Sequence, residues 1–356
     1  MILVTGGAGF IGANFVLDWT QQSTEALLVV DCLSYAGNLA NLDPVSAGGQ
    51  FNAQVGFQRV DLRNAEATRQ IVLEHAPRAI LHFAAESHVD RSIVGPADFI
   101  QTNIVGSFNL LQAARELYAS KSRDEGFVRS FRFLHVSTDE VYGSLGAEDP
   151  PFRETTPYAP NSPYSASKAA SDHLVRAWQH TYGLPTLTTN CSNNYGPLQF
   201  PEKLIPLMIN HAIQGKELPV YGDGGNVRDW LFVRDHCTAI RRVLEAGRPG
   251  EVYNIGGGAE MDNLRVVHAI CDGLDVRRPR SDGKSYREQV QFVSDRPGHD
   301  RRYAIDFSKL REELGWYPTE SFSSGLGKTI DWYLDNASWV RSIEQRRAAL
   351  ALEIRH

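Results

Sequence analysis

The segment ILVTGGAGFIG at the amino terminus constrains the fold of this chain more than any other stretch. An apolar strand runs into a cluster of glycines, and Ile11, Phe15, Val16 and Trp19 follow at helical spacing. The alternation continues through ALLVVD, FQRVD, ATRQIVLEHA, AILHFAAES, FRFLHVST and LTTNCS. Continuous apolar strands that alternate with helices indicate a parallel sheet covered on both faces. We therefore predict an α/β fold with a doubly wound parallel sheet.

The glycines of TGGAGFIG have the spacing of a dinucleotide-binding loop. Gly7, Gly9 and Gly12 match G-x-G-x-x-G, directly after a strand and at the start of a helix. Glycines let the backbone approach a pyrophosphate, whose charge is met by helix amides. Asp31 ends the second strand, where a carboxylate accepts from a ribose hydroxyl and repels a 2′-phosphate, which favours NAD over NADP. Asp61 fits a contact beside the adenine or, equally, a helix cap.

The sequence changes character near Asn194. Residues 1–193 are predicted to form a Rossmann-type NAD-binding domain. Beyond them, Pro and Gly become frequent and the alternation breaks, so residues 194–336 are predicted to form a smaller, irregular α+β substrate-binding lobe. DWLFVRDH and EVYNIGG, near residues 228–256, are expected to return to the large sheet. Residues 337–356 are expected to form a charged helical tail.

Composition excludes several classes of protein. The 356 residues are 42% hydrophobic and 22% charged, which argues against disorder, and a net charge of −6 gives no footprint for nucleic acid. The four cysteines are scattered without CxxC pairs, which argues against a zinc site or a disulfide framework and fits a reducing compartment. His88-x-Asp90 lacks further ligands, so no metal is expected. With a strand predicted from Ile2 and no long apolar run, we expect no signal peptide, no membrane span and a cytoplasmic location.

Tyr164-Ser-Ala-Ser-Lys168 places a phenol and an ammonium on one face of a helix. The ordinary tyrosine pKa of about 10 is too high for a base near neutrality. We expect Lys168 and a positive nicotinamide ring to lower the pKa of Tyr164. The phenolate then takes a proton from a sugar hydroxyl as hydride leaves the same carbon.

HVSTDEVYGS ends an apolar strand in Thr138, Asp139 and Glu140. Two adjacent carboxylates at the end of a buried strand are costly to desolvate unless something uses them. Two adjacent carboxyl groups at this position could act in catalysis, one as a base and the other as an acid.

These motifs together resemble the extended short-chain dehydrogenase/reductase superfamily, whose members oxidise carbons of nucleotide sugars. STDEVYG, AAESHVDRS and NCSNNYGPLQFPEKLIP are similar to the narrower dTDP-glucose 4,6-dehydratase family, and the similarity extends over nearly the whole chain. It implies an NAD-dependent lyase of deoxysugar biosynthesis, such as rhamnose biosynthesis. The implied reaction converts dTDP-glucose to dTDP-4-keto-6-deoxyglucose.

The resemblance also implies a role for each residue of the strand end. Hydride leaves C4, Glu140 removes the C5 proton, and protonated Asp139 gives its proton to O6, which departs as water. Thr138 hydrogen-bonds O4 and assists Tyr164. The hydride returns to C6, so no net oxidation occurs and NAD⁺ is expected to stay tightly bound. Asp139 must keep a proton near neutrality, so burial and the charge of Glu140 are expected to raise its pKa.

By the same resemblance, further residues are expected to hold the two ligands. The cofactor set is Gly6, Gly9, Phe10, Ile11, Gly12, Asp31, Asp61, Leu62, Ala84, Thr102, Tyr164, Lys168 and Asn193. The substrate set is Ser87, Thr138, Asn194, Lys203, Leu204, Tyr221, Arg228, Asn263, Arg296 and His299. Arg228 and Arg296 are expected to meet the diphosphate. Spacing does not decide which of Asn193 and Asn194 faces the cofactor.

Several alternatives stay open at this point. A UDP-sugar 4,6-dehydratase fits most of the same motifs. A nucleotide-sugar 4-epimerase has no need of Asp139 and Glu140, and an NAD-binding regulatory protein has no need of Tyr164 and Lys168. The helices near 102–118 and 162–182 carry apolar residues on more than one face. The family pairs them in a four-helix homodimer interface, although both could simply pack on the sheet.

Overall fold

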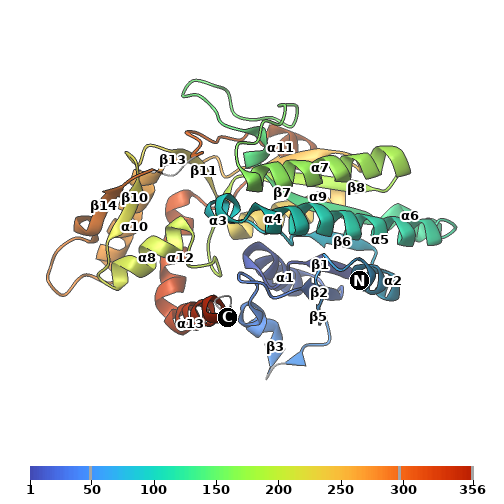
Figure 1. Cartoon of the computed structure of the whole chain (residues 1–356), viewed down its shortest axis with the longest axis horizontal. Coiled ribbons are helices and arrows are strands. Elements are labelled where there is room, and N and C mark those ends of the chain that lie inside the picture. Colours follow the sequence, from blue (N-terminus) through green and yellow to red (C-terminus); the bar gives the residue numbers. More distant parts are fainter. Residues whose placement is uncertain (48–49, 296–297, 354–356) are drawn as a thin grey trace.

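The computed structural model of the chain describes residues 1–47, 50–295 and 298–353. Its central element is a seven-stranded parallel sheet with the strand order β12-β8-β7-β6-β1-β2-β5 (Figure 1). The strands are β1 (Ile2–Thr5), β2 (Leu27–Asp31), β5 (Val55–Arg59), β6 (Ala79–His82), β7 (Arg132–Thr138), β8 (Thr186–Cys191) and β12 (Val252–Ile255). The chain winds outward from β1 in one direction and from β6 in the other. The predicted doubly wound sheet is thereby confirmed, and its switch point lies between β1 and β6.

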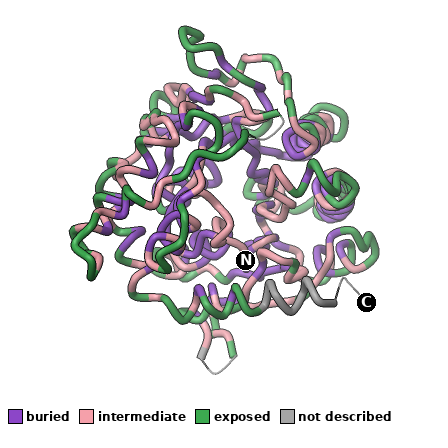
Figure 2. The backbone as a smooth tube through the Cα atoms, turned by 60° about the vertical axis from the view of Figure 1, so that its left-hand side comes forward, coloured by how far each residue is buried: buried purple, intermediate pink, exposed green. Residues whose placement is uncertain are grey.

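Helices cover both faces of this sheet. The helices on one face are α2 (Ala65–His75), α5 (Ser107–Ser120) and α7 (Pro163–Tyr182), and those on the other are α1 (Phe10–Gln22), α9 (Val233–Ala246) and α11 (Ser308–Leu314). Successive strand residues point to opposite faces. Accordingly, Leu3 packs with α5 and α7 and Val4 packs with α1 and α9. The strands of this sheet are buried almost throughout except for the edge strand β5, and the outer sides of the helices are exposed (Figure 2).

A smaller lobe lies at one end of the sheet (Figure 1). Its helices are α8 (Leu204–Ile213), α10 (Asn263–Arg277) and α12 (Phe322–Asp335), which share one apolar core. Its strands are β9 (Asn193–Tyr195), β11 (Val227–Phe232) and β13 (Glu260–Asp262) in one sheet, and β10 (Leu218–Tyr221) and β14 (Val290–Val293) in another. As predicted, EVYNIGG joins the large sheet, as β12. The prediction for DWLFVRDH is wrong, because β12 occupies the position beside β8 and β11 pairs with β9 and β13 instead.

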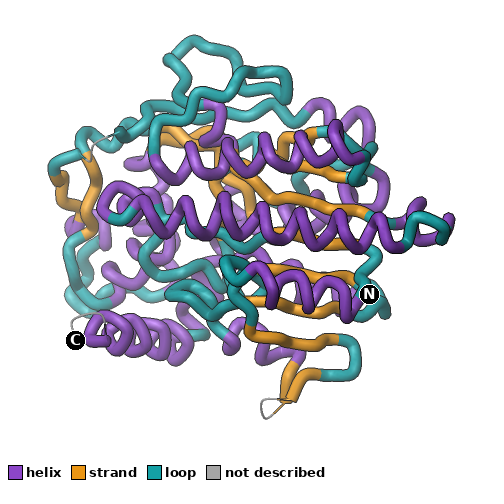
Figure 3. The backbone as a smooth tube through the Cα atoms, turned by 45° about the vertical axis from the view of Figure 1, so that its right-hand side comes forward, coloured by secondary structure: helices purple, strands orange, loops and turns teal. Residues whose placement is uncertain are grey.

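Short elements connect these layers. They are η1 (Leu39–Val45), β3 (Ser46–Ala47), β4 (Gln50–Phe51), α3 (Val89–Val94), α4 (Pro96–Phe99), η2 (Ile100–Gly106), α6 (Glu125–Ser130), η3 (Asp139–Tyr142) and η4 (Tyr286–Gln289). The segments α4, η2 and α5 follow one another without a break and form one long helix that runs beside α7 (Figure 3). None of the helices in the described part of the chain combines the length and apolar composition that a bilayer span requires.

The carboxyl-terminal helix α13 (Ala337–Glu353) connects the two halves of the molecule. Trp339 packs on Trp332 of α12, with ring centroids 4.9 Å apart, and its indole donates to Asn41 Oδ1 at 2.9 Å. Asn41 Nδ2 in turn donates to the carbonyl of Ala8, in the glycine loop, at 2.8 Å. The first turns of the predicted tail are therefore docked against the rest of the fold through Trp339.

Candidate active site

A cavity of about 400 Å³ lies at the carboxyl ends of the central strands, at the switch point of the sheet. All of the predicted catalytic and cofactor residues line it: Gly6, Gly9, Phe10, Ile11, Gly12, Asp31, Asp61, Leu62, Ala84, Thr102, Thr138, Asp139, Glu140, Tyr164, Lys168 and Asn193. Of the further predicted substrate residues, Ser87, Asn194 and Lys203 also line it. Ligands of doubly wound folds bind at this edge of the sheet.

The glycine loop is shaped for close approach of backbone to backbone. Gly6 adopts φ +69°, and a Cβ on Gly12 would lie 2.3 Å from the Gly6 carbonyl oxygen. A Cβ on Gly6 would lie 2.6 Å from the amide nitrogen of Ala84, which follows β6. Helix α1 begins at Phe10 without a side-chain cap on its amides, so its positive end faces the cavity. This arrangement fits the pyrophosphate of a dinucleotide.

Asp31 is held rigidly at the cavity wall. Its Oδ2 accepts from the amide of Ala8 at 3.1 Å, and its Oδ1 accepts from the amide of Leu33 at 2.8 Å. Gly37 closes over the carboxylate, where a Cβ would approach Oδ1 to 2.6 Å. A fixed carboxylate at the end of the second strand is suited to a ribose diol. With the glycine loop, it makes the residues present a match for NAD.

Asp61 lines the same wall and does not cap a helix. Its carboxylate pairs with the guanidinium of Arg63 at 2.6 Å and accepts from the Arg63 amide at 2.9 Å. The cap of α2 is Asn64, whose side chain accepts from the amide of Ala67. The structure thus excludes the helix-cap alternative and leaves the cofactor contact.

The strand end of β7 brings the two acids into the cavity. Thr138 caps the turn η3, where its Oγ1 accepts from the amide of Glu140 at 3.3 Å and donates to Asp139 Oδ1 at 3.4 Å. Asp139 is 1% exposed, and its Oδ2 has no hydrogen-bond partner within the described part of the chain. Burial first, then the charges of Glu140 and Asp229, raise the pKa of Asp139 well above its ordinary value. The expected direction of this shift and its two expected causes are confirmed.

Tyr164 and Lys168 lie side by side in the first turns of α7. Ser162 caps this helix with a capping box, and Pro163 follows at its first position. Burial and the charge of Glu140 raise the pKa of Tyr164 well above 10, against a hydrogen bond with Thr138. Among the chain's own groups desolvation of the phenolate dominates, and the lowering expected from Lys168 together with a positive nicotinamide stays a prediction. Positive charge brought by bound NAD⁺ acts in the opposite direction.

The remaining predicted substrate residues lie in the smaller lobe, outside the wall of this cavity. Leu204 begins α8, Tyr221 ends β10, and Asn263 begins α10. His299 packs edge-on against Tyr221, with ring centroids 6.2 Å apart. Arg296 lies outside the described residues. The roles predicted for these side chains stay predictions.

Arg228 is buried rather than presented to the cavity. Its guanidinium stacks over the ring of Tyr303 at 4.1 Å and donates to the carbonyls of Val227 and Asp300 at 2.7 and 2.8 Å. It lies close enough to Asp139 to oppose the rise of that pKa. A diphosphate contact from Arg228 stays a prediction.

The two consecutive asparagines both reach the cavity. The side chain of Asn194 is held from behind, since its Nδ2 donates to the Ser192 carbonyl at 3.0 Å and its Oδ1 lies 2.8 Å from His236 Nδ1. Asn193 precedes it on β9, so the two side chains point to opposite faces of that strand. Which of them faces the cofactor stays open.

Two groups of residues at the site escaped the sequence reasoning. Tyr35, just after β2, meets Phe200 at a ring-centroid distance of 5.5 Å and carries the guanidinium of Arg91 at 3.7 Å over its ring. No local motif marks this contact, because Arg91 on α3 and Phe200 come from segments that are far from Tyr35 in the sequence. His135 and Asp172 lie behind Lys168. Asp172 follows Lys168 by four residues, as Lys168 follows Tyr164. This spacing alone could have indicated that Asp172 lies on the same helix face.

Known proteins share this architecture over almost the whole chain. The family model described as GDP-mannose 4,6 dehydratase matches residues 3–329. The chain is 60% identical to the dTDP-glucose 4,6-dehydratase of Xanthomonas campestris pv. campestris, covering 96% of this chain and 95% of that protein. It is 54% identical to dTDP-glucose 4,6-dehydratase 1 of Escherichia coli K12, with the same coverage of 96% and 95%.

Solved structures of related enzymes have the same fold as this chain. The crystal structure of the dTDP-glucose 4,6-dehydratase of Streptomyces venezuelae with NAD bound has a TM-score of 0.85 and 44% identity, covering 96% of this chain and 99% of that one. A UDP-glucose 4-epimerase of Thermus thermophilus, also solved with NAD, has a TM-score of 0.80 and 30% identity, with coverage of 94% and 99%. The family model and the relatives at 54–60% identity cover nearly the whole chain, which therefore belongs to the nucleotide-sugar 4,6-dehydratase family, among its dTDP-glucose 4,6-dehydratases.

Proposed function

We propose that this chain is an NAD-dependent lyase that converts dTDP-glucose to dTDP-4-keto-6-deoxyglucose and water. The observation that carries the proposal is the position of Asp139. This carboxyl is buried, has a raised pKa, and adjoins Glu140 in the cavity that also contains Tyr164 and the glycine loop. A 4-epimerase needs a base at O4 but neither an acid at O6 nor a base at C5, so the pair favours dehydration.

The chain's residues divide the proton transfers between them. Tyr164 takes the proton of O4, and Thr138 holds that oxygen. NAD held by the glycine loop and Asp31 would supply the redox chemistry, its oxidised form accepting the hydride of C4 and its reduced form returning that hydride to C6. Once C4 is a ketone the C5 proton is acidic, and Glu140 removes it while Asp139 protonates O6, which leaves as water. Glu140 returns its proton to C5, and the proton taken from O4 balances the one given to O6.

The test uses the purified protein with dTDP-glucose and no added NAD⁺. Mass spectrometry should show a product lighter by one water, formed over many turnovers by cofactor that stays bound. UDP-glucose serves as the competing substrate in a parallel reaction. An isomer of unchanged mass would replace the proposal with an epimerase, and absence of any conversion would refute both activities.

We further propose a homodimer formed by a four-helix bundle of α5 and α7 from each copy. These helices lie side by side (Figure 3), and the outer face exposes Phe108 of α5 (40%) and Tyr182 of α7 (44%). A cytoplasmic location belongs to the same proposal, as does the division into 1–193, 194–336 and 337–356, with α9, β12 and α11 returning from the second range to the large sheet. Support for the location comes from the four cysteines, all of them free and all within the described residues. Sedimentation of the intact protein measures the assembly.

A further inference from the structure

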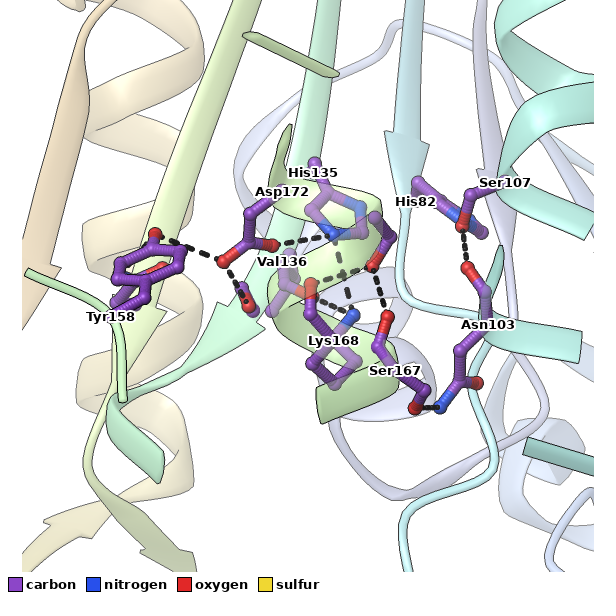
Figure 4. A network of polar contacts seen from close by, with 12 residues as sticks. His82, Asn103, Ser107, His135, Val136, Tyr158, Ser167, Lys168 and Asp172 are labelled. Carbon is purple, nitrogen blue, oxygen red and sulfur yellow. Dashed lines mark hydrogen bonds and ion pairs between the residues drawn. The ribbon is translucent and has the colours of Figure 1, made fainter. Parts of the chain in front are cut away.

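A buried polar network surrounds Lys168 (Figure 4), and its members His135 and Asp172 do not line the cavity. The ammonium of Lys168 donates to the carbonyl of Val136 at 3.0 Å and lies 3.4 Å from His135 Nε2. The same ring nitrogen lies 3.1 Å from Asp172 Oδ1. Asp172 follows Lys168 by one helical turn on α7, and His135 faces α7 from β7. One line of contacts therefore joins the carboxylate, the imidazole and the ammonium.

The network is sealed from solvent. His135, Lys168 and Asp172 are 0%, 3% and 5% exposed. A buried ammonium is costly unless an opposite charge and hydrogen bonds accompany it. Burial lowers the pKa of Lys168, and the charge of Asp172 is the largest influence that opposes this. The Cys191 thiol beside it is kept neutral by burial, which raises its pKa above the ordinary range.

Hydrogen-bond donors and a neighbouring ammonium favour the charged form of Asp172. Its Oδ2 accepts from Ser137 Oγ at 2.9 Å and from the Tyr158 hydroxyl at 3.0 Å. Its Oδ1 lies 3.1 Å from His135 Nε2 and has no hydrogen-bond partner within the described part of the chain. Burial raises the pKa of Asp172 to about 6, and Lys168 together with these hydroxyls opposes the rise. Near neutrality the group is charged.

The imidazole of His135 lies between the carboxylate of Asp172 and the ammonium of Lys168 and is itself uncharged. Burial and the charge of Lys168 hold the pKa of His135 well below its ordinary value, so the ring is neutral. Nε2 lies 3.4 Å from the Lys168 ammonium and 3.1 Å from Asp172 Oδ1, and it accepts from the ammonium in the tautomer that carries the ring proton on Nδ1. In both tautomers the dipole of the ring lies between the carboxylate and the ammonium. A charged imidazolium relay is excluded by the same burial.

We propose that Asp172, acting through His135, is the counter-ion that keeps Lys168 protonated and aimed at the cavity beside Tyr164. The inference rests on the proposed function, since it concerns the step in which Tyr164 takes the proton of O4. Asp172 and His135 are positioning residues, because neither lines the cavity. Their contribution is confined to C4 oxidation and is absent from the elimination at C5 and C6.

The charged and titratable groups around this pair come from several elements. They are Lys168 and His173 on α7, His135 on β7, His82 on β6, Cys191 on β8, Tyr142 on η3, and Tyr158 in the loop before α7. His82 and Tyr142 add no charge near neutrality, because burial lowers the pKa of His82 well below 6.5 and raises that of Tyr142. Asp172 is thus the carboxylate whose removal changes the charge state of Lys168.

The test is the pH profile of C4 oxidation in Asp172→Asn. Asparagine keeps the shape and can still accept from Ser137 and Tyr158, but it removes the charge. An opposite charge at this range shifts a pKa by about 1 to 3 units, so the alkaline limb should move to lower pH by that amount. KM for dTDP-glucose should change little. Thr189→Val is the matched control, since this buried hydroxyl on β8 has no hydrogen-bond partner among the described residues.

Tyr158→Phe provides a second, milder variant should Asp172→Asn fail to fold. It removes one donor from Asp172, so the pKa of Asp172 rises and the acidic limb should move to higher pH. A uniform loss of kcat at every pH, or limbs identical to those of Thr189→Val, would overturn the inference and leave Asp172 a structural residue. Failure of the wild-type chain to turn over dTDP-glucose is a different result, and it would refute the proposed function instead.

Discussion

Replacing Asp139 with asparagine should show separately how much this buried acid lowers the stability of the fold and how much it accelerates the loss of water. Asp139 is 1% exposed, and its pKa in the folded protein is raised well above the ordinary value. Between the pKa of about 3.9 in the unfolded chain and the higher pKa of the fold, only the unfolded state loses the proton. The free energy of unfolding therefore falls by about 1.4 kcal/mol for each pH unit across this window. Asparagine carries no proton to lose and removes this slope.

The expected result is a variant that is more stable and less active. The stability difference between Asp139→Asn and the wild type should grow as pH rises from about 4 toward the raised pKa, and it should level off above it. Other titrating groups are common to both proteins and cancel in the difference. General acid catalysis contributes about 10²- to 10⁴-fold, so water loss should slow by about 3 to 5 kcal/mol in the barrier.

Urea unfolding at a series of pH values measures the first effect, and quenched-flow mass spectrometry of dTDP-glucose turnover measures the second. A nucleotide sugar with fluoride at C6 is the matched control, since fluoride leaves without a proton and should restore elimination to Asp139→Asn. A stability difference that is the same at acidic and alkaline pH would show that Asp139 is ionised in the fold. Water loss at the wild-type rate would refute its role as the acid at O6.

The remaining predictions concern the base and the cofactor loop. Glu140→Gln should still oxidise C4, which is measured as reduced-nicotinamide absorbance in a single turnover. Its elimination of water should be slower by about 10²- to 10⁴-fold, and the fluoro substrate should not restore it. Water release at the normal rate would contradict the role of Glu140 as the C5 base. Gly12→Ala should abolish retention of NAD, because the new Cβ would lie 2.3 Å from the Gly6 carbonyl oxygen. Cofactor content measured by absorbance after gel filtration checks this, and a stoichiometric NAD load would refute the close-packing argument.

Much of the site could be predicted because its motifs are local. The glycine loop follows β1 directly, and Tyr164 and Lys168 share one helix face by spacing alone. Thr138, Asp139 and Glu140 are consecutive, and the end of a parallel strand places them at the ligand edge of the sheet. Only residues that are neighbours in sequence, or one helical turn apart, are placed together in this way.

Other parts were decided by which strands and loops become neighbours. DWLFVRDH has the apolar pattern of a central strand, but β12 occupies the edge that it was expected to take, so it pairs in the smaller lobe. Tyr35 meets Phe200 across 165 positions of the chain, and no local pattern records such a contact. The same is true of Trp339 and Asn41, through which the charged tail docks near the glycine loop.

The sequence by itself determined that hydride moves and that water leaves, because the groups responsible are carried by short, ordered motifs. The tertiary structure alone decided the charge states on which that chemistry depends. Burial raises the pKa of Tyr164 and lowers that of Lys168, and the charge of Asp172 opposes the second of these shifts. Desolvation depends on everything packed around a group, and the order of residues along the chain does not contain that information explicitly.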